Sequence, residues 1–147
     1  MAQFFLGEYD VPVDEKGRVF LPADLRRKLL PEDGDTLVVT RGLDGCLNAH
    51  PHQAWSEIAT RIADLPQTDQ NARQYYRVVF SQAAEVRLDR QGRATLPKKL
   101  LDRAGISDRM VIAGAGRKLE FWEPDSWNSY LTPAQAELTH SAEGLPL

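Results

Sequence analysis

The sequence predicts an α+β protein in which two copies of one short unit interlock into a single barrel-like core. Two observations predict this class. The phrase DEKGRVFLP at residues 14–22 returns as DRQGRATLP at residues 89–97. Around each copy, short segments that alternate polar and apolar residues, as strands do, flank one short helix pattern. Self-similarity at a fixed offset is the signature of a duplicated structural unit.

The repeat is strongest over residues 14–25, where an offset of 75 gives six identities in twelve positions. The identical pairs are Asp14 and Asp89, Gly17 and Gly92, Arg18 and Arg93, Leu21 and Leu96, Pro22 and Pro97, and Leu25 and Leu100. With small gaps the similarity continues, since TLVVT at 36–40 corresponds to MVIAG at 110–114 and Trp55 corresponds to Trp127. We therefore infer an internal duplication.

Each unit predicts the element order β-β-α-β-β. Residues 9–13 and 84–88 alternate as half-buried strands do. The Asp-x-x-Gly-Arg that follows predicts a tight turn, because aspartate accepts backbone N–H groups and glycine adopts a positive φ at little cost. A short apolar strand then leads to a proline at a helix start, where its missing N–H matters least. One unit buries too little apolar surface to be stable alone, so we expect the two to share one core.

Two helices are predicted between the units, each with one apolar face at the 3.6-residue period. The first helix ends before Pro66, and its apolar face consists of Trp55, Ile58, Ala59 and Ile62. The apolar face of the second helix consists of Ala72, Tyr75, Tyr76, Val79 and Phe80. We expect both to pack on the barrel or against a neighbouring subunit. After Tyr130 we expect only a short helix following Pro133. The expected organisation is a first module at 8–54, inter-module helices at 55–82, a second module at 83–126 and a C-terminal tail at 127–147.

Composition excludes several classes of protein. No apolar run is long enough to span a bilayer, and the first residues do not form a secretory signal. A single cysteine, Cys46, excludes an intramolecular disulfide framework and suits a reducing cytoplasm. The net charge is −3, yet residues 14–30 hold five basic against three acidic side chains, and residues 87–103 hold six against two. Basic charge gathered around both copies of the motif is the electrostatic footprint of a polyanion site.

These motifs resemble the MraZ family of bacterial transcriptional regulators, which carry two SpoVT/AbrB-type modules. The stretches that carry the resemblance are FFLGEYDVPVDEKGRVFLPADLR, VRLDRQGRATLPKKLLDRAGI and KLEFWEPDSW, and it covers residues 4 to about 130. The resemblance implies that each module is a swapped-hairpin half of a β-barrel and that the two modules form a pseudo-dimer within one chain. It also implies that subunits assemble into a ring-shaped homo-oligomer.

The resemblance further implies a function in the cytoplasm, at the nucleoid. Members of the family bind double-stranded DNA at short direct repeats in the promoter region of the operon for cell division and cell-wall synthesis, and act mainly as its repressor. Carried over by position, the DNA-facing residues are Lys16 and Arg18 in the first module and Arg90 and Arg93 in the second. Arginine suits this role because its planar fork bonds guanine O6 and N7, or phosphate oxygens, bidentately.

The remaining motif residues are expected to brace the two turns: Asp14, Gly17, Asp89 and Gly92. The middle positions of the motif differ, with Glu15-Lys16 in the first copy and Arg90-Gln91 in the second. Either the second copy contacts DNA more strongly, or the two copies read different bases.

An enzyme is not expected, because no Ser/His/Asp constellation or phosphate-binding loop stands out and the motif aspartates have no obvious partner acid. Cys46, His50 and His52 lack a second ligand pair at zinc-site spacing, so no metal or other cofactor is expected. No membrane partner is expected either. Two alternatives stay open: an antitoxin-like AbrB-type protein, and a ring scaffold with no DNA role. The sequence does not fix the subunit number, the operator bases, an effector or the role of residues 131–147.

Overall fold

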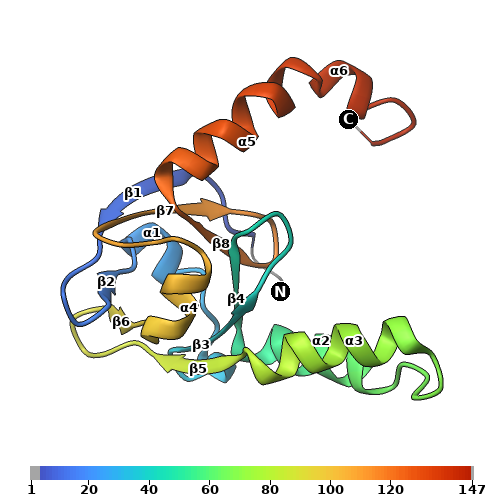
Figure 1. Cartoon of the computed structure of the whole chain (residues 1–147). Helices are drawn as coiled ribbons and strands as arrows, with labels where there is room; N and C mark the ends of the chain where they lie inside the picture. The colour runs from blue at the N-terminus through green and yellow to red at the C-terminus, as the bar shows by residue number, and fades with distance from the viewer. Residues whose placement is uncertain (1–3, 147) are drawn as a thin grey trace.

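The computed structural model describes residues 4–146 and contains the β-β-α-β-β order twice (Figure 1). The first half comprises β1 (Glu8–Pro12), β2 (Arg18–Phe20), α1 (Ala23–Arg26), a 3-10 turn (Pro31–Asp33), β3 (Thr36–Arg41), β4 (Leu47–Pro51), α2 (His52–Ala63) and α3 (Gln70–Ser81). The second half comprises β5 (Ala84–Arg87), β6 (Arg93–Thr95), α4 (Lys98–Arg103), β7 (Arg109–Gly114), β8 (Leu119–Trp122), α5 (Pro124–Ala136) and α6 (Leu138–Ser141). The predicted α+β class is confirmed.

The main sheet is antiparallel and mixes strands of both halves in the order β1-β7-β8-β4-β3-β5. β1 of the first half pairs with β7 of the second, with Tyr9 opposite Ile112. β5 of the second half pairs with β3 of the first, with Val86 opposite Leu37. Each half therefore gives its first strand to the third strand of the other half. Neither half completes the sheet alone, which agrees with the small core that one unit could bury.

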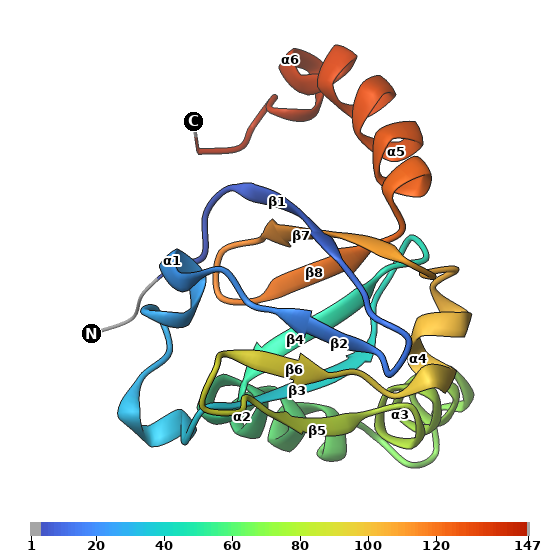
Figure 2. The same ribbon diagram turned by 90° about the vertical axis from the view of Figure 1, so that its left-hand side faces the viewer.

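A second sheet consists of β2 and β6 only, one strand from each half. We call this two-stranded antiparallel sheet the ribbon. Its register pairs Arg18 with Thr95, Val19 with Ala94, and Phe20 with Arg93. Figure 2 shows the ribbon in front of the main sheet, between the edge strands β1 and β5. The ribbon thus covers the face of the core that the main sheet leaves open.

The core lies between the main sheet and the ribbon. Val19 and Ala94 close it from the ribbon side, each with 2% of its surface exposed. Strands and helices of both halves contribute the other side chains, among them Leu25, Leu37, Val39, Leu47, Leu100, Met110, Ile112, Leu119 and Phe121. A single apolar cluster shared by both halves is what makes the duplicated chain one folding unit.

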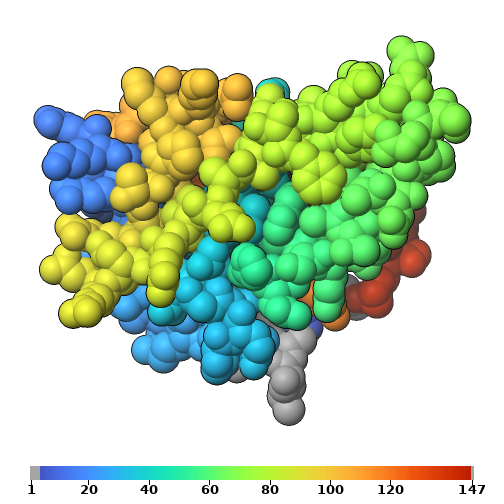
Figure 3. All heavy atoms as spheres, turned by 90° about the horizontal axis from the view of Figure 1, so that it is seen from below, coloured from blue at the N-terminus to red at the C-terminus, as the bar shows by residue number. Residues whose placement is uncertain are grey.

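The helices α2 and α3 form a hairpin that extends from one end of the main sheet (Figure 1) and lies along the face seen in Figure 3. Ile62 of α2 and Val79 of α3 are buried, as the predicted apolar faces require. The hydroxyl of Thr40 in β3 donates to the Val79 carbonyl at 2.7 Å and ties α3 to the sheet. The aromatic part of the α3 face stays open, since Tyr75 and Phe80 are 49% and 39% exposed.

The C-terminal segment is more regular than the sequence analysis predicts. The predicted short helix after Pro133 is present as α6, Leu138–Ser141, but the longer helix α5 before it was not predicted: it begins at Pro124 and runs through Pro133 to Ala136. The missed start signal is a cap: the Glu123 carboxylate accepts the backbone N–H groups of Asp125 and Ser126. No helix within residues 4–146 has the length and apolar character to cross a bilayer.

The helices α2 and α5 occupy equivalent places in the two halves, and an aromatic contact marks each. Trp55 of α2 lies 5.6 Å, between ring centroids, from His50 in β4. Trp127 of α5 lies 5.3 Å from Trp122 in β8. The structural repeat therefore continues past β4 and β8 into the helix that follows each.

Candidate nucleic-acid interface

The first Asp-x-x-Gly-Arg motif folds into a turn that its aspartate closes. Oδ1 of Asp14 accepts the backbone N–H groups of Lys16 and Arg18 at 2.9 and 2.8 Å. Oδ2 of Asp14 accepts Nε–H of the Arg18 side chain at 2.6 Å. Gly17 has a φ of 80°, in the left-handed region, where a residue with a Cβ is strained. One carboxylate thus fixes both the loop and the arginine that follows it.

The second motif repeats this geometry. Oδ1 of Asp89 accepts the backbone N–H groups of Gln91 and Arg93, both at 2.9 Å, and Oδ2 accepts Nε–H of Arg93 at 2.8 Å. Gly92 has a φ of 82°. In both turns the aspartate thus accepts the same three N–H groups, and the glycine has the same left-handed backbone conformation.

Both motif aspartates are held in the charged state. The backbone N–H of Arg18 lowers the pKa of Asp14 below its ordinary value, with further lowering by the Arg18 side chain. The backbone N–H of Arg93 does the same to the pKa of Asp89. Each carboxylate therefore stays ionised at neutral pH and keeps its arginine in place.

Strand alternation places both arginines on the outer face of the ribbon. Val19 and Ala94 point into the core, so the residues on either side of them point outward. The outer face carries Arg18, Phe20, Arg93 and Thr95. Because the strands are antiparallel, the two turns lie at opposite ends of this face, one at the start of each strand.

Each turn is also tied to the strand of the other half. The N–H of Leu21 donates to the Gly92 carbonyl at 3.0 Å, and the N–H of Leu96 donates to the Gly17 carbonyl at 2.9 Å. The two turns and the ribbon are therefore one rigid surface. Lys16 and Arg90, the other predicted DNA-facing residues, are exposed in the two turns.

The surroundings of the two turns differ. A Cβ on Gly92 would lie 2.7 Å from the guanidinium of Arg26, which reaches over from α1 and donates Nε–H to the Leu21 carbonyl at 3.0 Å. At the equivalent place beside Gly17, the nearest side chain is that of Leu101. The second turn thus has one more cation beside it than the first.

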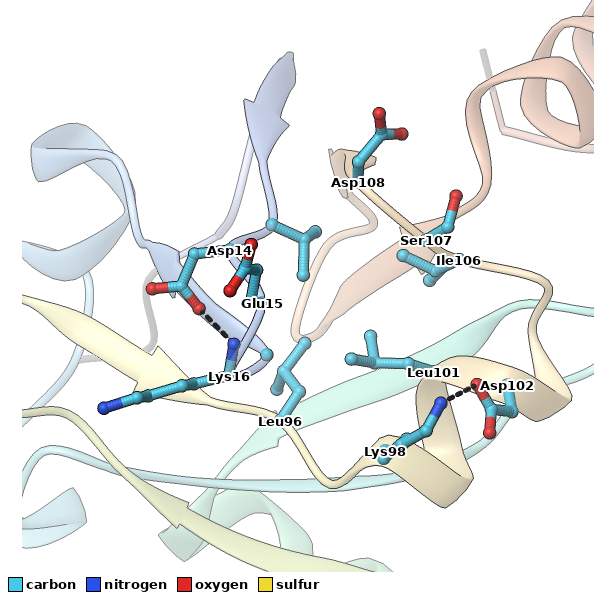
Figure 4. A pocket seen from close by; sticks show the side chains of 12 residues that line it. Asp14, Glu15, Lys16, Leu96, Lys98, Leu101, Asp102, Ile106, Ser107 and Asp108 are labelled. Carbon is cyan, nitrogen blue, oxygen red and sulfur yellow. Dashed lines mark hydrogen bonds and ion pairs between the residues drawn. The ribbon is translucent and has the colours of Figure 1, made fainter.

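A cleft of about 710 Å³ lies beside the first turn, bounded by α4 and the start of β7 (Figure 4). Its floor is apolar and includes Leu101, while Asp14 and Asp108 stand at its rim. At the rim, Lys98 forms an ion pair with Asp102, one turn further along α4, at 3.4 Å. The space beside the second turn is smaller, about 450 Å³, and includes Arg87 and Arg90 in its lining.

The residues considered as metal ligands have ordinary structural roles. Sγ of Cys46 donates to the Leu43 carbonyl at 3.1 Å, and burial raises the pKa of Cys46 to about 12. His50 is 7% exposed, and burial lowers its pKa to about 4. His52 begins α2. Across residues 4–146, no three His, Cys, Asp or Glu side chains gather in an arrangement that could hold a metal ion.

Two residues of this surface are not among those predicted from the sequence. Phe20 belongs to a segment interpreted as a short apolar strand, yet it is 55% exposed and faces outward with Arg18. The period of two along β2 would have shown this, since Val19 and Phe20 cannot both be buried in one layer. In the sequence, Arg26 is only one of the basic residues of the segment 14–30. Its contact with Gly92 joins elements of different halves, and no local sequence pattern indicates such a contact.

Comparison with known proteins agrees with this architecture. The family model described as "MraZ protein, putative antitoxin-like" matches twice, at residues 4–78 and 79–145. Transcriptional regulator MraZ of Carboxydothermus hydrogenoformans is 42% identical over 95% of this chain and 94% of its own. The proteins of the same name from Syntrophomonas wolfei and Ligilactobacillus salivarius are 40% and 36% identical, each over 96% of both chains. Two matches in tandem and relatives that align almost end to end show that this chain belongs to the MraZ family.

Proposed function

We propose that this protein is a sequence-specific DNA-binding transcriptional regulator without catalytic activity. It acts mainly as a repressor of the operon for cell division and cell-wall synthesis, in the cytoplasm at the nucleoid. Its operator consists of short direct repeats in the promoter region, and it binds them as a ring-shaped homo-oligomer. The strands exchanged between the halves then correspond to the swapped hairpins of a pseudo-dimeric barrel. The names of the relatives and the resemblance of the motifs support this proposal.

The ribbon is the observation that carries the proposal. A two-stranded β-ribbon fits the major groove of B-DNA, which is about 12 Å wide. Within the described residues, Asp14 and Asp89 bond Arg18 and Arg93 through Nε. The terminal Nη groups of each guanidinium are the pair that bonds O6 and N7 of a guanine. A bound, pre-oriented arginine also loses less side-chain entropy on binding DNA than a free one.

Assembly explains how so small a surface could select an operator. One ribbon spans only a few base pairs, so a single subunit should bind weakly. A ring that presents several ribbons to several repeats raises the effective concentration of each further contact. Affinity should therefore rise steeply from one operator repeat to two or more.

The test is fluorescence anisotropy with DNA from directly upstream of the protein's own gene, beside a scrambled duplex of equal length, at stated salt. We expect preference for the upstream DNA and a steep gain with repeat number. Equal affinity for both duplexes would exclude sequence-specific binding. A protein that forms rings and binds neither duplex would be the scaffold of the alternative hypothesis.

The assembly is tested separately by size exclusion with light scattering. A mass of several subunits at micromolar concentration is expected, and a monomer would contradict the ring. The antitoxin-like alternative has weaker support, since its usual acidic, disordered tail contrasts with the helices α5 and α6 that follow the second module here.

A further inference from the structure

Phe20 is an exposed aromatic residue in the middle of a charged surface. It ends β2, directly opposite Arg93 in the ribbon register, and 55% of its surface is exposed. Its neighbour Val19 is 2% exposed, so the outward position of Phe20 follows from strand alternation and the burial of Val19. Cζ of Arg93 lies 5.9 Å from the centre of the Phe20 ring, within the range of a cation–π interaction.

The partner that fits this ring follows from the chemistry of the major groove. The C5-methyl group of thymine is the apolar feature on base edges there, and phenylalanine is among the residues that contact it. A ring held beside an arginine that reaches for guanine would meet the floor of the groove together with that arginine. A phosphate or sugar contact would instead leave the ring in a polar environment with no gain from burial.

We propose that Phe20 contacts thymine C5-methyl groups in the major groove and makes the half of the ribbon that carries Arg93 selective for thymine. This inference rests on the proposed DNA-binding function and adds a specificity-determining residue to it. The other half of the ribbon differs, because Thr95 stands opposite Arg18 where Phe20 stands opposite Arg93. Threonine offers only one methyl group toward a thymine methyl, and its hydroxyl can bond other bases, so the two halves read DNA unequally.

The experiment removes the methyl group and the ring separately and then together. The DNA upstream of the protein's own gene is prepared with either thymine or uracil, which lacks the C5-methyl group. The full-length protein and Phe20→Thr, which copies the residue of the other half, are titrated with both duplexes at one salt concentration. Leu43→Thr is the matched control, since Leu43 is 77% exposed in the turn after β3, outside the ribbon.

The parent protein should bind uracil DNA about fourfold more weakly for each methyl group contacted, the factor expected for burying one methyl. Phe20→Thr should bind thymine DNA more weakly than the parent and should show a smaller difference between the two duplexes, because its single methyl group covers less of a thymine methyl than the ring does. Leu43→Thr should behave like the parent. If the loss of affinity on removing both the ring and the methyl group is smaller than the sum of the two separate losses, the ring and the methyl group are in direct contact.

Four results would overturn the inference. Equal affinity of the parent for thymine and uracil DNA would show that no methyl group is read, while preference over a scrambled duplex would leave the proposed function intact. Undiminished sensitivity of Phe20→Thr to uracil would assign the methyl contact to another residue. A lower oligomeric mass of Phe20→Thr in light scattering would make Phe20 a subunit contact. Failure of the parent to prefer its upstream DNA at all would remove the proposed function and this inference with it.

Discussion

The two turns of this protein share a brace and differ in what surrounds it. In both, one aspartate accepts two backbone N–H groups and the Nε–H of the following arginine, at distances that agree within 0.2 Å. Beside the first turn lie Leu101 and Thr95, whereas Arg26 and Phe20 take these places beside the second. The two copies therefore share the geometry that holds an arginine outward and differ in the contacts around it.

The same contrast appears deeper in the two halves. His50 and Trp122 occupy equivalent positions at the ends of β4 and β8, each against a tryptophan of the following helix. The first half therefore contains a buried group that can be protonated where the second contains only an indole.

Alanine at the two motif glycines should destabilise the protein unequally. A Cβ on Gly17 would lie 2.6 Å from the backbone oxygen of Leu96, which cannot move without disturbing the ribbon. A Cβ on Gly92 would meet the end of the Arg26 side chain, which can swing away. We expect Gly17→Ala to lower the free energy of unfolding by about 3 kcal/mol or more, and Gly92→Ala by about 1–2 kcal/mol from the positive φ. Urea unfolding of both variants measures this, and equal losses would contradict it.

His50 should make the stability of the protein depend on pH. Because burial lowers its pKa in the folded state to about 4, below the ordinary 6.5, the unfolded chain binds the proton more readily. The loss of folding free energy caused by this difference in pKa is absent above pH 6.5 and grows as the pH falls. It is complete below about pH 4, where it reaches on the order of 2–3 kcal/mol. His50→Phe should lose this part of the pH dependence. Denaturant titrations of both proteins across this window test it, and parallel curves would show that His50 does not titrate as stated.

Alanine at the motif arginines should weaken operator binding and leave the fold unchanged. We expect a loss of about 1–3 kcal/mol per site for Arg18→Ala and for Arg93→Ala, smaller on scrambled DNA. The loss should be greater for Arg93→Ala, because Arg93 also lies over the Phe20 ring. Binding isotherms on both duplexes, with a melting curve for each variant, measure this.

Lys98→Ala is the control for the arginine variants, since the Lys98 side chain is 87% exposed and pairs only weakly with Asp102 at 3.4 Å. It should weaken operator and scrambled DNA equally and reduce the salt slope by about one for each phosphate that Lys98 neutralises. Arginine variants that bind operator DNA like the parent, or that lose binding only by unfolding, would refute the assigned interface.

Removing the charge of the bracing aspartates should have the smallest effect on stability and should be similar in the two turns. The lowered pKa of Asp14 and Asp89 means that the ionised carboxylates stabilise the fold above the ordinary value of 3.8 and lose this effect as the pH falls through the lowered native value. Asp14→Asn and Asp89→Asn should each melt slightly below the parent at neutral pH. The difference should fade as the pH falls below 3.8 and through the lowered native pKa. A clear inequality between the two variants would show that the braces are not equivalent.

Local sequence determined much of this protein. The repeated Asp-x-x-Gly-Arg predicts its turns because the hydrogen bonds of the brace run within five consecutive residues, from Asp14 to Arg18 and from Asp89 to Arg93. The periodicity of apolar residues predicts the strands and the two helices after β4, because a strand or helix that buries one face shows a regular repeat of apolar residues within its own segment. The family resemblance rests on these same local motifs.

Tertiary structure decided which elements meet. Strands β1 and β5 share one alternating pattern, and β3 and β7 share a more continuous apolar one, so the patterns do not distinguish pairing within a half from pairing between halves. Only closure of one common core selects the pairs β1 with β7 and β3 with β5. The meeting of Phe20 with Arg93, and of Arg26 with Gly92, follows from that exchange, because each pair joins residues of different halves. A sequence pattern specifies hydrogen bonds between near neighbours, whereas contacts between distant segments depend on how all the apolar faces are buried at once.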